Sequence, residues 1–297
     1  MNVEGFVSIE RPDGKVFEFG NGFYEIEIDG AGTLTREIYT EAKGIGHGAI
    51  VIGSRIPPRS MLISSDTFVT DNGDLRDEVD EFFRYPEDEH KIIVSYKNKT
   101  RWIKGQIEVF DLPLGYVGAP QAFNLSVLCT DPLFRSMDEF GKDIANILPM
   151  WGWPFFSPMN PSDYNNPVAS ADPYVTKGNI TGVYEFEQKA FLANDGDFPT
   201  FPRAVITTTA QTSHIILYVD EARLVIIEDT LNPSDTLEVD FGEETVFKNG
   251  VNINSKINRQ SVFFSIPRGG IDFRYAASKN VSAIHVTIYY NQLYKGV

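Results

Sequence analysis

Strand-like alternation of apolar and polar residues runs through much of the first half of the chain. Residues 16–19 and 23–28 alternate in this way, and Gly20-Asn21-Gly22 separates them, which predicts two strands joined by a hairpin-type break. Because successive side chains of a strand point to opposite faces, Phe23 and Ile26 should lie on opposite faces of the second strand. Further strands are predicted at residues 92–96, 102–110 and 123–129.

The segment 74–83 switches to helical spacing. Asp74 is placed to cap the amide groups at the helix start, and Pro86 follows as a stop signal. The apolar residues of this segment recur on one helical face, which predicts that they pack against a sheet. They are Leu75, Val79, Phe82 and Phe83.

A second helix is predicted from Ser136 to Leu148. Ser136 and Glu139 have the spacing of a capping box, and Pro149 ends the pattern. The apolar stripe, which is a core or packing face, consists of Met137, Phe140, Ile144, Ile147 and Leu148.

A segment rich in proline and aromatic residues follows. Six prolines lie between Pro149 and Pro173, and proline removes amide donors, so this segment is the predicted domain junction. Its aromatic cluster is either buried between domains or exposed as an interface or ligand contact. The candidate residues are Trp151, Trp153, Phe155 and Phe156.

The second half of the chain is almost entirely strand-like. Asn249-Gly250 is a strong two-residue hairpin signal, because both positions tolerate positive φ. Many short strands at regular spacing predict an antiparallel sandwich. We therefore divide the chain into residues 1–148, a linker at 149–175, and a sandwich at 176–297. The predicted strands are 182–186, 204–209, 214–219, 223–227, 236–240, 262–266, 271–275 and 282–290.

The composition supports a mainly β globular protein, and the net charge argues against some classes of partner. The chain is 42% hydrophobic and carries 22 Phe and 13 Tyr, which favour pleated, half-buried surfaces. Its net charge of −15 argues against specific binding of nucleic acid or of an anionic membrane, since both require a basic face. No secretory signal or membrane-spanning run is recognised, and Cys129 is the one cysteine, so synthesis in a cytoplasm is expected.

No catalytic, cofactor-binding or metal-binding constellation is recognisable. Phosphate loops, dinucleotide fingerprints, nucleophile elbows and zinc-protease motifs are all lacking in the sequence. Gly44, Gly46 and Gly48 are spaced in twos without a following helix, which indicates a flexible loop. The acidic turns at 71–74 and 194–197 do not match a calcium loop. We expect a protein that is not an enzyme and has no cofactor.

Several segments resemble the siphophage tail-component family, whose members include the distal tail proteins. Residues 194–206 resemble its turn-and-proline entry into a strand, and residues 231–240 resemble its loop and strand ending in Asp. The Asn249-Gly250 hairpin and residues 264–270 continue the order, and residues 127–134 resemble the step that closes the ring domain. The segment from Trp151 to Phe156 departs from the pattern.

This resemblance implies an N-terminal ring-forming β domain with one or two helices and a C-terminal galectin-like antiparallel β-sandwich. It also implies a homo-hexamer at the virion tail tip, made in the host cytoplasm. The ring would join the tail tube protein to the tail-tip or tail-associated protein and the receptor-binding protein. The resemblance identifies no catalytic residue in this sequence.

Two other function classes remain open. A carbohydrate-binding adhesin or receptor-binding module would use the C-terminal sandwich with Trp151 and Trp153. A polysaccharide-degrading enzyme would need a pair of carboxylates that the sequence does not single out. A large closed oligomer in solution would favour the structural ring protein over the adhesin and the enzyme.

Overall fold

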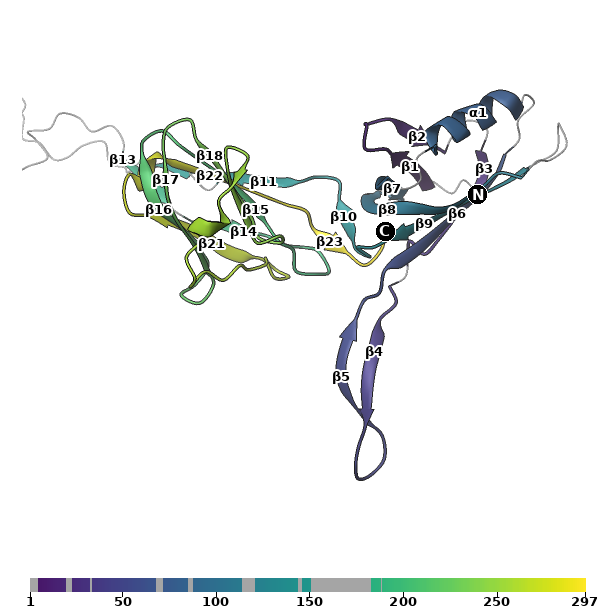
Figure 1. Cartoon of the computed structure of the whole chain (residues 1–297), viewed down its shortest axis with the longest axis horizontal. Coiled ribbons are helices and arrows are strands. Elements are labelled where there is room, and N and C mark those ends of the chain that lie inside the picture. The colour runs from purple at the N-terminus through teal and green to yellow at the C-terminus, as the bar shows by residue number, and fades with distance from the viewer. Residues whose placement is uncertain are drawn as a thin grey trace, which may run out of the picture. The chain divides into compact units, whose positions relative to one another are not determined.

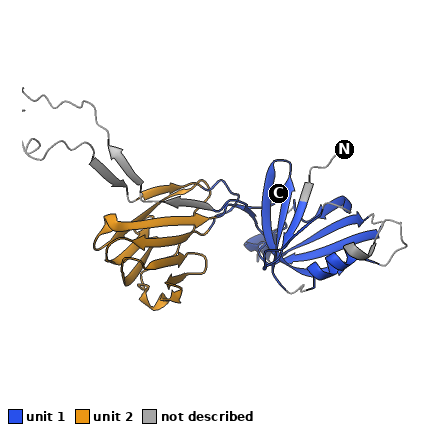
Figure 2. Cartoon of the chain, turned by 90° about the horizontal axis from the view of Figure 1, so that it is seen from above, with its two compact units in different colours: residues 1–139, 194–200, 291–297 blue, residues 140–193, 201–290 orange. Residues whose placement is uncertain are grey.

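A computed structural model describes residues 5–19, 23–32, 34–67, 72–84, 88–113, 121–143, 146–150, 183–187 and 189–297. The chain divides into two units that are not consecutive halves (Figure 2). Unit 1 consists of residues 1–139, 194–200 and 291–297, and unit 2 of residues 140–193 and 201–290. The predicted boundaries at 148/149 and 175/176 stay predictions. The end of the chain packs in unit 1, far in sequence from the rest of that unit.

Unit 1 is built on an antiparallel sheet whose order is β2-β1-β7-β8-β9-β6-β3 (Figure 1). β10 pairs with β8 on one side and with β23 on the other, so the last strand of the chain joins this sheet. The strands are β1 (Gly5–Glu10), β2 (Val16–Glu18), β3 (Phe23–Asp29), β6 (Arg59–Thr67), β7 (His90–Tyr96), β8 (Lys99–Asp111), β9 (Gln121–Cys129), β10 (Phe134–Ser136) and β23 (Leu293–Tyr294).

A cluster of phenylalanine rings fills the core of unit 1. Phe17 contacts Phe82 and Phe83 with ring centroids 5.3 and 5.5 Å apart, which joins β2 to the helix α1 (Asn72–Phe82). Phe23 and Phe123, 5.4 Å apart, extend the cluster across β3 and β9. Tilted and edge-to-face pairs of this kind add to the free energy gained by burying the rings.

The first predicted helix is confirmed, with different ends. α1 begins at Asn72, so Asp74 lies inside the first turn and is not the cap. Val79, Phe82 and Phe83 are buried as predicted. The side chain of Leu75, and Pro86, lie outside the described residues.

A bulge overturns the predicted faces of β3. The pairing of β3 with β6 shifts register between Tyr24 and Glu27, and Glu25 adopts φ 52°. The extra residue reverses the alternation, so Ile26 packs against the same core as buried Phe23.

The second predicted helix is wrong. Residues 136–148 instead contribute to three strands: β10, β11 (Phe140–Asp143) and β12 (Asn146–Met150). β11 pairs with β22 (Ile284–Tyr290), and β12 pairs with β13 (Val183–Glu187). The partner of β11 lies about 150 residues away in sequence and that of β12 about 40 residues away. The spacing of apolar residues within 136–148 carries no information about these partners.

Unit 2 contains two larger antiparallel sheets. One has the order β11-β22-β15-β18-β19-β20 and the other β14-β21-β16-β17, and their apolar side chains share one buried cluster. The predicted mainly β fold with a C-terminal sandwich is confirmed. The additional strands are β14 (Lys189–Leu192), β15 (Arg203–Thr208), β16 (Thr212–Tyr218), β17 (Leu224–Leu231), β18 (Thr236–Asp240), β19 (Thr245–Lys248), β20 (Val251–Asn252) and β21 (Ile271–Ala277).

The Asn249-Gly250 hairpin is confirmed. These residues join β19 to β20 with φ values of 50° and 78°, as the tight turn requires. Residues 262–266, by contrast, form no regular strand, although Phe264 and Ile266 are buried. Burial of every second side chain there produced a strand-like pattern without a strand ladder.

The cluster of phenylalanine side chains in the core of unit 1 leads to a prediction about stability. Phe83→Ala should lower the free energy of unfolding of unit 1 by about 3–5 kcal/mol, because it leaves a cavity among aromatic rings. Phe83 is buried, while Phe201 in unit 2 is exposed, so Phe201→Ala serves as the matched control. Denaturant unfolding of the full chain measures both. Equal stability of Phe83→Ala and wild type would contradict the described packing.

Candidate docking surfaces of unit 1

A two-stranded hairpin projects from unit 1 (Figure 1). It consists of β4 (Glu37–Ala42) and β5 (Ala49–Arg55), which pair only with each other. The glycine-rich segment predicted as a flexible loop forms its tip, with φ of 93° at Gly46 and 95° at Gly48. Neither strand is among those predicted from the sequence, although two runs with β-branched residues flank a glycine turn, which is a hairpin signal.

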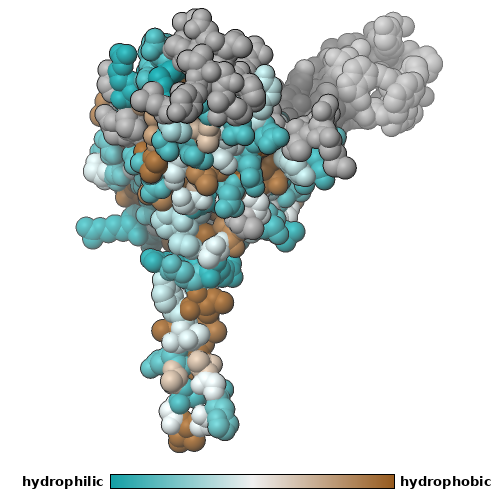
Figure 3. All heavy atoms as spheres, turned by 90° about the vertical axis from the view of Figure 1, so that its right-hand side faces the viewer, coloured by the Kyte–Doolittle hydropathy of each residue, from teal (hydrophilic) through white to brown (hydrophobic). Residues whose placement is uncertain are grey.

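The two faces of this hairpin differ in polarity. The register places Glu37 opposite Arg55 on one face, and Thr40 opposite Val51 on the other. Ile38 is 59% exposed and Val51 is 63% exposed, and Figure 3 shows hydrophobic residues along the arm. The second face, which we call the apolar face, carries no charged side chain. It consists of Ile38, Thr40, Ala42, Ala49, Val51 and Ser54.

Ionic and hydrogen-bonding contacts occupy the polar face. The Arg55 Nε donates to Glu37 at 2.7 Å, and the Tyr39 hydroxyl donates to the same carboxylate at 2.9 Å. These hydrogen bonds hold the pKa of Glu37 below its usual value and raise the pKa values of Tyr39 and Arg55. Glu37, Tyr39 and Arg55 therefore satisfy one another at the root end of this face, while Glu41 and the exposed Ile50 lie on the same face nearer the tip.

The buried guanidinium of Arg59 fastens the root of the hairpin. It donates to the carbonyl oxygens of Gly30 and Ala31 at 2.9 and 3.2 Å, and to that of Lys295 at 2.5 Å. Burial lowers its pKa from the ordinary arginine value. Gly30 has φ +83°, and a Cβ there would lie 2.5 Å from the Ser60 carbonyl, so the root requires glycine.

The end of the chain packs against the same root. The Val297 amide donates to the Ala31 carbonyl at 3.4 Å, and Arg101 donates to the carbonyl of Gly296. The guanidinium of Arg101 also lies 3.5 Å from the centre of the Tyr294 ring. The hairpin root is thus held by residues from both ends of the sequence.

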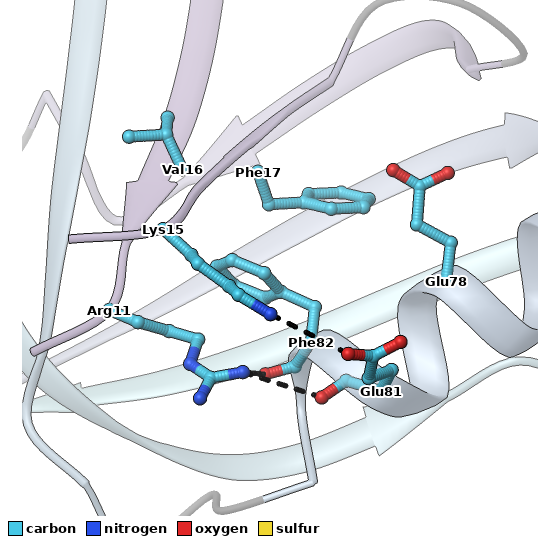
Figure 4. A pocket seen from close by; sticks show the side chains of 7 residues that line it. All are labelled: Arg11, Lys15, Val16, Phe17, Glu78, Glu81 and Phe82. Carbon is cyan, nitrogen blue, oxygen red and sulfur yellow. Dashed lines mark hydrogen bonds and ion pairs between the residues drawn. The ribbon is translucent and has the colours of Figure 1, made fainter. Parts of the chain in front are cut away.

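A cavity of about 270 Å³ opens between the β1–β2 turn and α1 (Figure 4). Val16, Phe17 and Phe82 form its apolar lining, and Val16 is 51% exposed. Arg11 donates to the carbonyls of Glu81 and Phe82, at 3.4 and 3.3 Å, which satisfies the C-terminal end of the helix. The cavity is small, apolar at its base and charged at its rim.

The charged rim contains one ion pair and one spare carboxylate. Lys15 Nζ lies 3.5 Å from the Glu81 carboxylate. Figure 4 shows the Glu78 carboxylate apart from that pair. Glu78 has no ion-pair partner among the residues that the structure describes.

The aromatic residues singled out from the sequence, Trp151, Trp153, Phe155 and Phe156, lie outside the described residues. Within the described ranges, no group of three or more His, Cys, Asp or Glu side chains could hold a metal ion. The described helices include none that is long and apolar enough to cross a membrane.

The hairpin root yields a second prediction. Arg59→Met should destabilise unit 1 by at least about 2 kcal/mol, because one buried and two partly buried carbonyl groups lose a charged donor. Amide hydrogen exchange should rise at residues 30–32 and 295–297. Exposed Arg36 provides the control Arg36→Met. Unchanged exchange at both segments would show that Arg59 does not join them.

Both the sequence and the fold of this chain are similar to those of known phage tail proteins. Residues 195–294 match the family model described as siphovirus-type tail component, C-terminal domain. No curated protein matches the chain by sequence. The crystal structure of the SPP1 Dit (gp 19.1) protein, described as a paradigm of the hub adsorption apparatus in phages infecting Gram-positive bacteria, matches with a TM-score of 0.65 and 14% identity, covering 97% of this chain and 98% of that chain.

A second match extends over the same length. The baseplate of phage P2 in its activated conformation with Ca aligns with a TM-score of 0.53 and 12% identity, covering 99% of each chain. Identities this low establish the fold, and the family model adds a match in sequence. Residues 195–294 are thus similar to the siphovirus-type tail component C-terminal domain, and the predicted resemblance of the chain to siphophage distal tail proteins is confirmed.

Proposed function

We propose that this protein is a structural hub of a long, non-contractile phage tail, assembled as a homo-hexameric ring at its distal end. The ring joins the tail tube protein to the tail-tip or tail-associated protein and to the receptor-binding protein. It is a virion component made in the host cytoplasm, and it is not an enzyme. The likeness to the SPP1 hub protein over 97% of the chain supports this role.

The exposed apolar face of the β4–β5 hairpin is the observation that carries the proposal. A two-stranded hairpin alone is at best marginally stable in water, so an arm of this kind is expected to gain a partner. An exposed apolar surface on a projecting element favours protein contact. A closed ring built head to tail requires each copy to present one patch that fits a different patch on its neighbour.

The polar face of the arm fits the same role. Its Glu37–Arg55 ion pair is exposed and contributes little to stability, but it keeps that face soluble. The apolar face can then pack against a neighbouring copy while the polar face stays in water. This asymmetry gives the arm one preferred docking side.

Charge on the apolar face should therefore break the ring. Val51→Asp is expected to convert the hexamer into monomers and small oligomers, because an unpaired carboxylate cannot be buried cheaply. Native mass spectrometry of the full chain measures the number of copies. Val251 is 65% exposed on another hairpin, close to the 63% of Val51, so Val251→Asp is the matched control.

Two results would contradict the proposal. A wild-type chain that is monomeric at all concentrations would exclude an autonomous ring, and a Val51→Asp chain that assembles like wild type would remove the hairpin from it. The adhesin alternative depends on Trp151 and Trp153, and no described residue favours it. Specific binding in a glycan screen would support that alternative.

A further inference from the structure

Unit 1 has an open cavity beside α1 and an exposed tip on the β4–β5 hairpin. The buried rings of Phe17 and Phe82 form the base of the cavity, and its rim carries Glu78, which has no ion-pair partner among the described residues (Figure 4). Exposed apolar surface in a concave site is the usual setting for an inserted side chain. The chain offers such a side chain on another part of its surface.

The hairpin tip presents a single apolar side chain in the most exposed position of the arm. Ile45 is 96% exposed and has Gly44 and Gly46 as neighbours. Nothing lies within 4 Å of where a Cβ of either glycine would be, so the tip is narrow and can approach another surface closely. A narrow tip with one branched side chain fits a small cavity better than a flat surface.

Both sites carry charges of both signs. The tip carries exposed Lys43 and Glu41, and the cavity rim carries Arg11, Lys15, Glu78 and Glu81. Lys43 and Glu78 each have no ion-pair partner within the part of the chain that the structure describes. Opposite charges on two such surfaces favour one docking partner and one orientation.

We propose that the hairpin tip of one copy inserts Ile45 into the cavity between the β1–β2 turn and α1 of a second copy, with Lys43 pairing with the partner copy's Glu78. This inference rests on the proposed self-assembly and names the receiving surface. It defines a heterologous contact, because the tip and the cavity are different patches of the same chain.

Charge reversal tests the contact. Lys43→Glu and Glu78→Lys, each alone, should raise the protein concentration at half-assembly about tenfold, because an attraction becomes a repulsion. The double variant Lys43→Glu/Glu78→Lys should return close to wild type. Lys256→Glu and Glu221→Lys, both exposed in unit 2, control for the change in net charge. Sedimentation velocity of the full chain gives the midpoints.

Disulfide trapping gives an independent readout. In the variant Lys43→Cys/Glu78→Cys, an added thiol oxidant should link successive copies into a ladder on a non-reducing gel. The native Cys129 does not interfere, because it is buried and burial raises its pKa to about 12. Lys43→Cys/Val251→Cys is the control and should give no ladder.

The outcomes separate the two proposals. A wild-type chain that never assembles overturns the ring and this contact together. A ring that forms normally in both single reversals, or a failure of the double variant to recover, overturns only the tip-to-cavity contact. Recovery in the double variant together with a ladder supports it.

Discussion

One buried guanidinium, that of Arg59, holds together parts of unit 1 that are farthest apart in sequence. Its hydrogen bonds reach the carbonyls of Gly30 and Ala31 on one side and of Lys295 on the other. The cation also lies 5.0 Å from the centre of the Phe134 ring, and Phe134 starts the strand that pairs with β23. A buried cation is costly unless its donors are satisfied, so the hairpin root, β10 and the chain end must be present together.

This constraint explains why the two units are interleaved along the chain. Unit 1 needs residues 194–200 and 291–297, which come before and after most of unit 2. A fragment ending at residue 148 would lack β23 and the Lys295 carbonyl. Unit 1 therefore includes residues from both sides of unit 2 in the sequence, and it needs residues 291–297 for the β10–β23 pairing and for the Arg59 bond to Lys295.

The hairpin shows how a stable scaffold can present a surface that is unfavourable in isolation. Arg59 holds its root, and Glu37, Tyr39 and Arg55 satisfy one another on its polar face. The apolar face and Ile45 stay exposed in the single chain. In the proposed ring, assembly would remove this apolar area from water, so the same residues would set both the free energy of association and the solubility of the free chain.

Sequence by itself determined the elements whose signals are local. The mainly β composition, the apolar face of α1 at Val79 and Phe82, and the Asn249-Gly250 turn depend on side-chain chemistry and backbone preference over a few residues. The family resemblance followed from short motifs in order. These features need no knowledge of distant partners.

Tertiary structure alone decided which strands pair and which residues return to another unit. Residues 140–143 and 146–150 form strands where helical spacing predicted a helix, since β22 and β13 offer hydrogen-bonding edges from other parts of the sequence. The bulge at Glu25, the burial of Arg59 and the projecting β4–β5 arm likewise depend on contacts across long stretches of sequence. Periodicity measures only which side chains share a face; it does not measure which distant backbone will lie beside it, and that pairing created the docking surfaces.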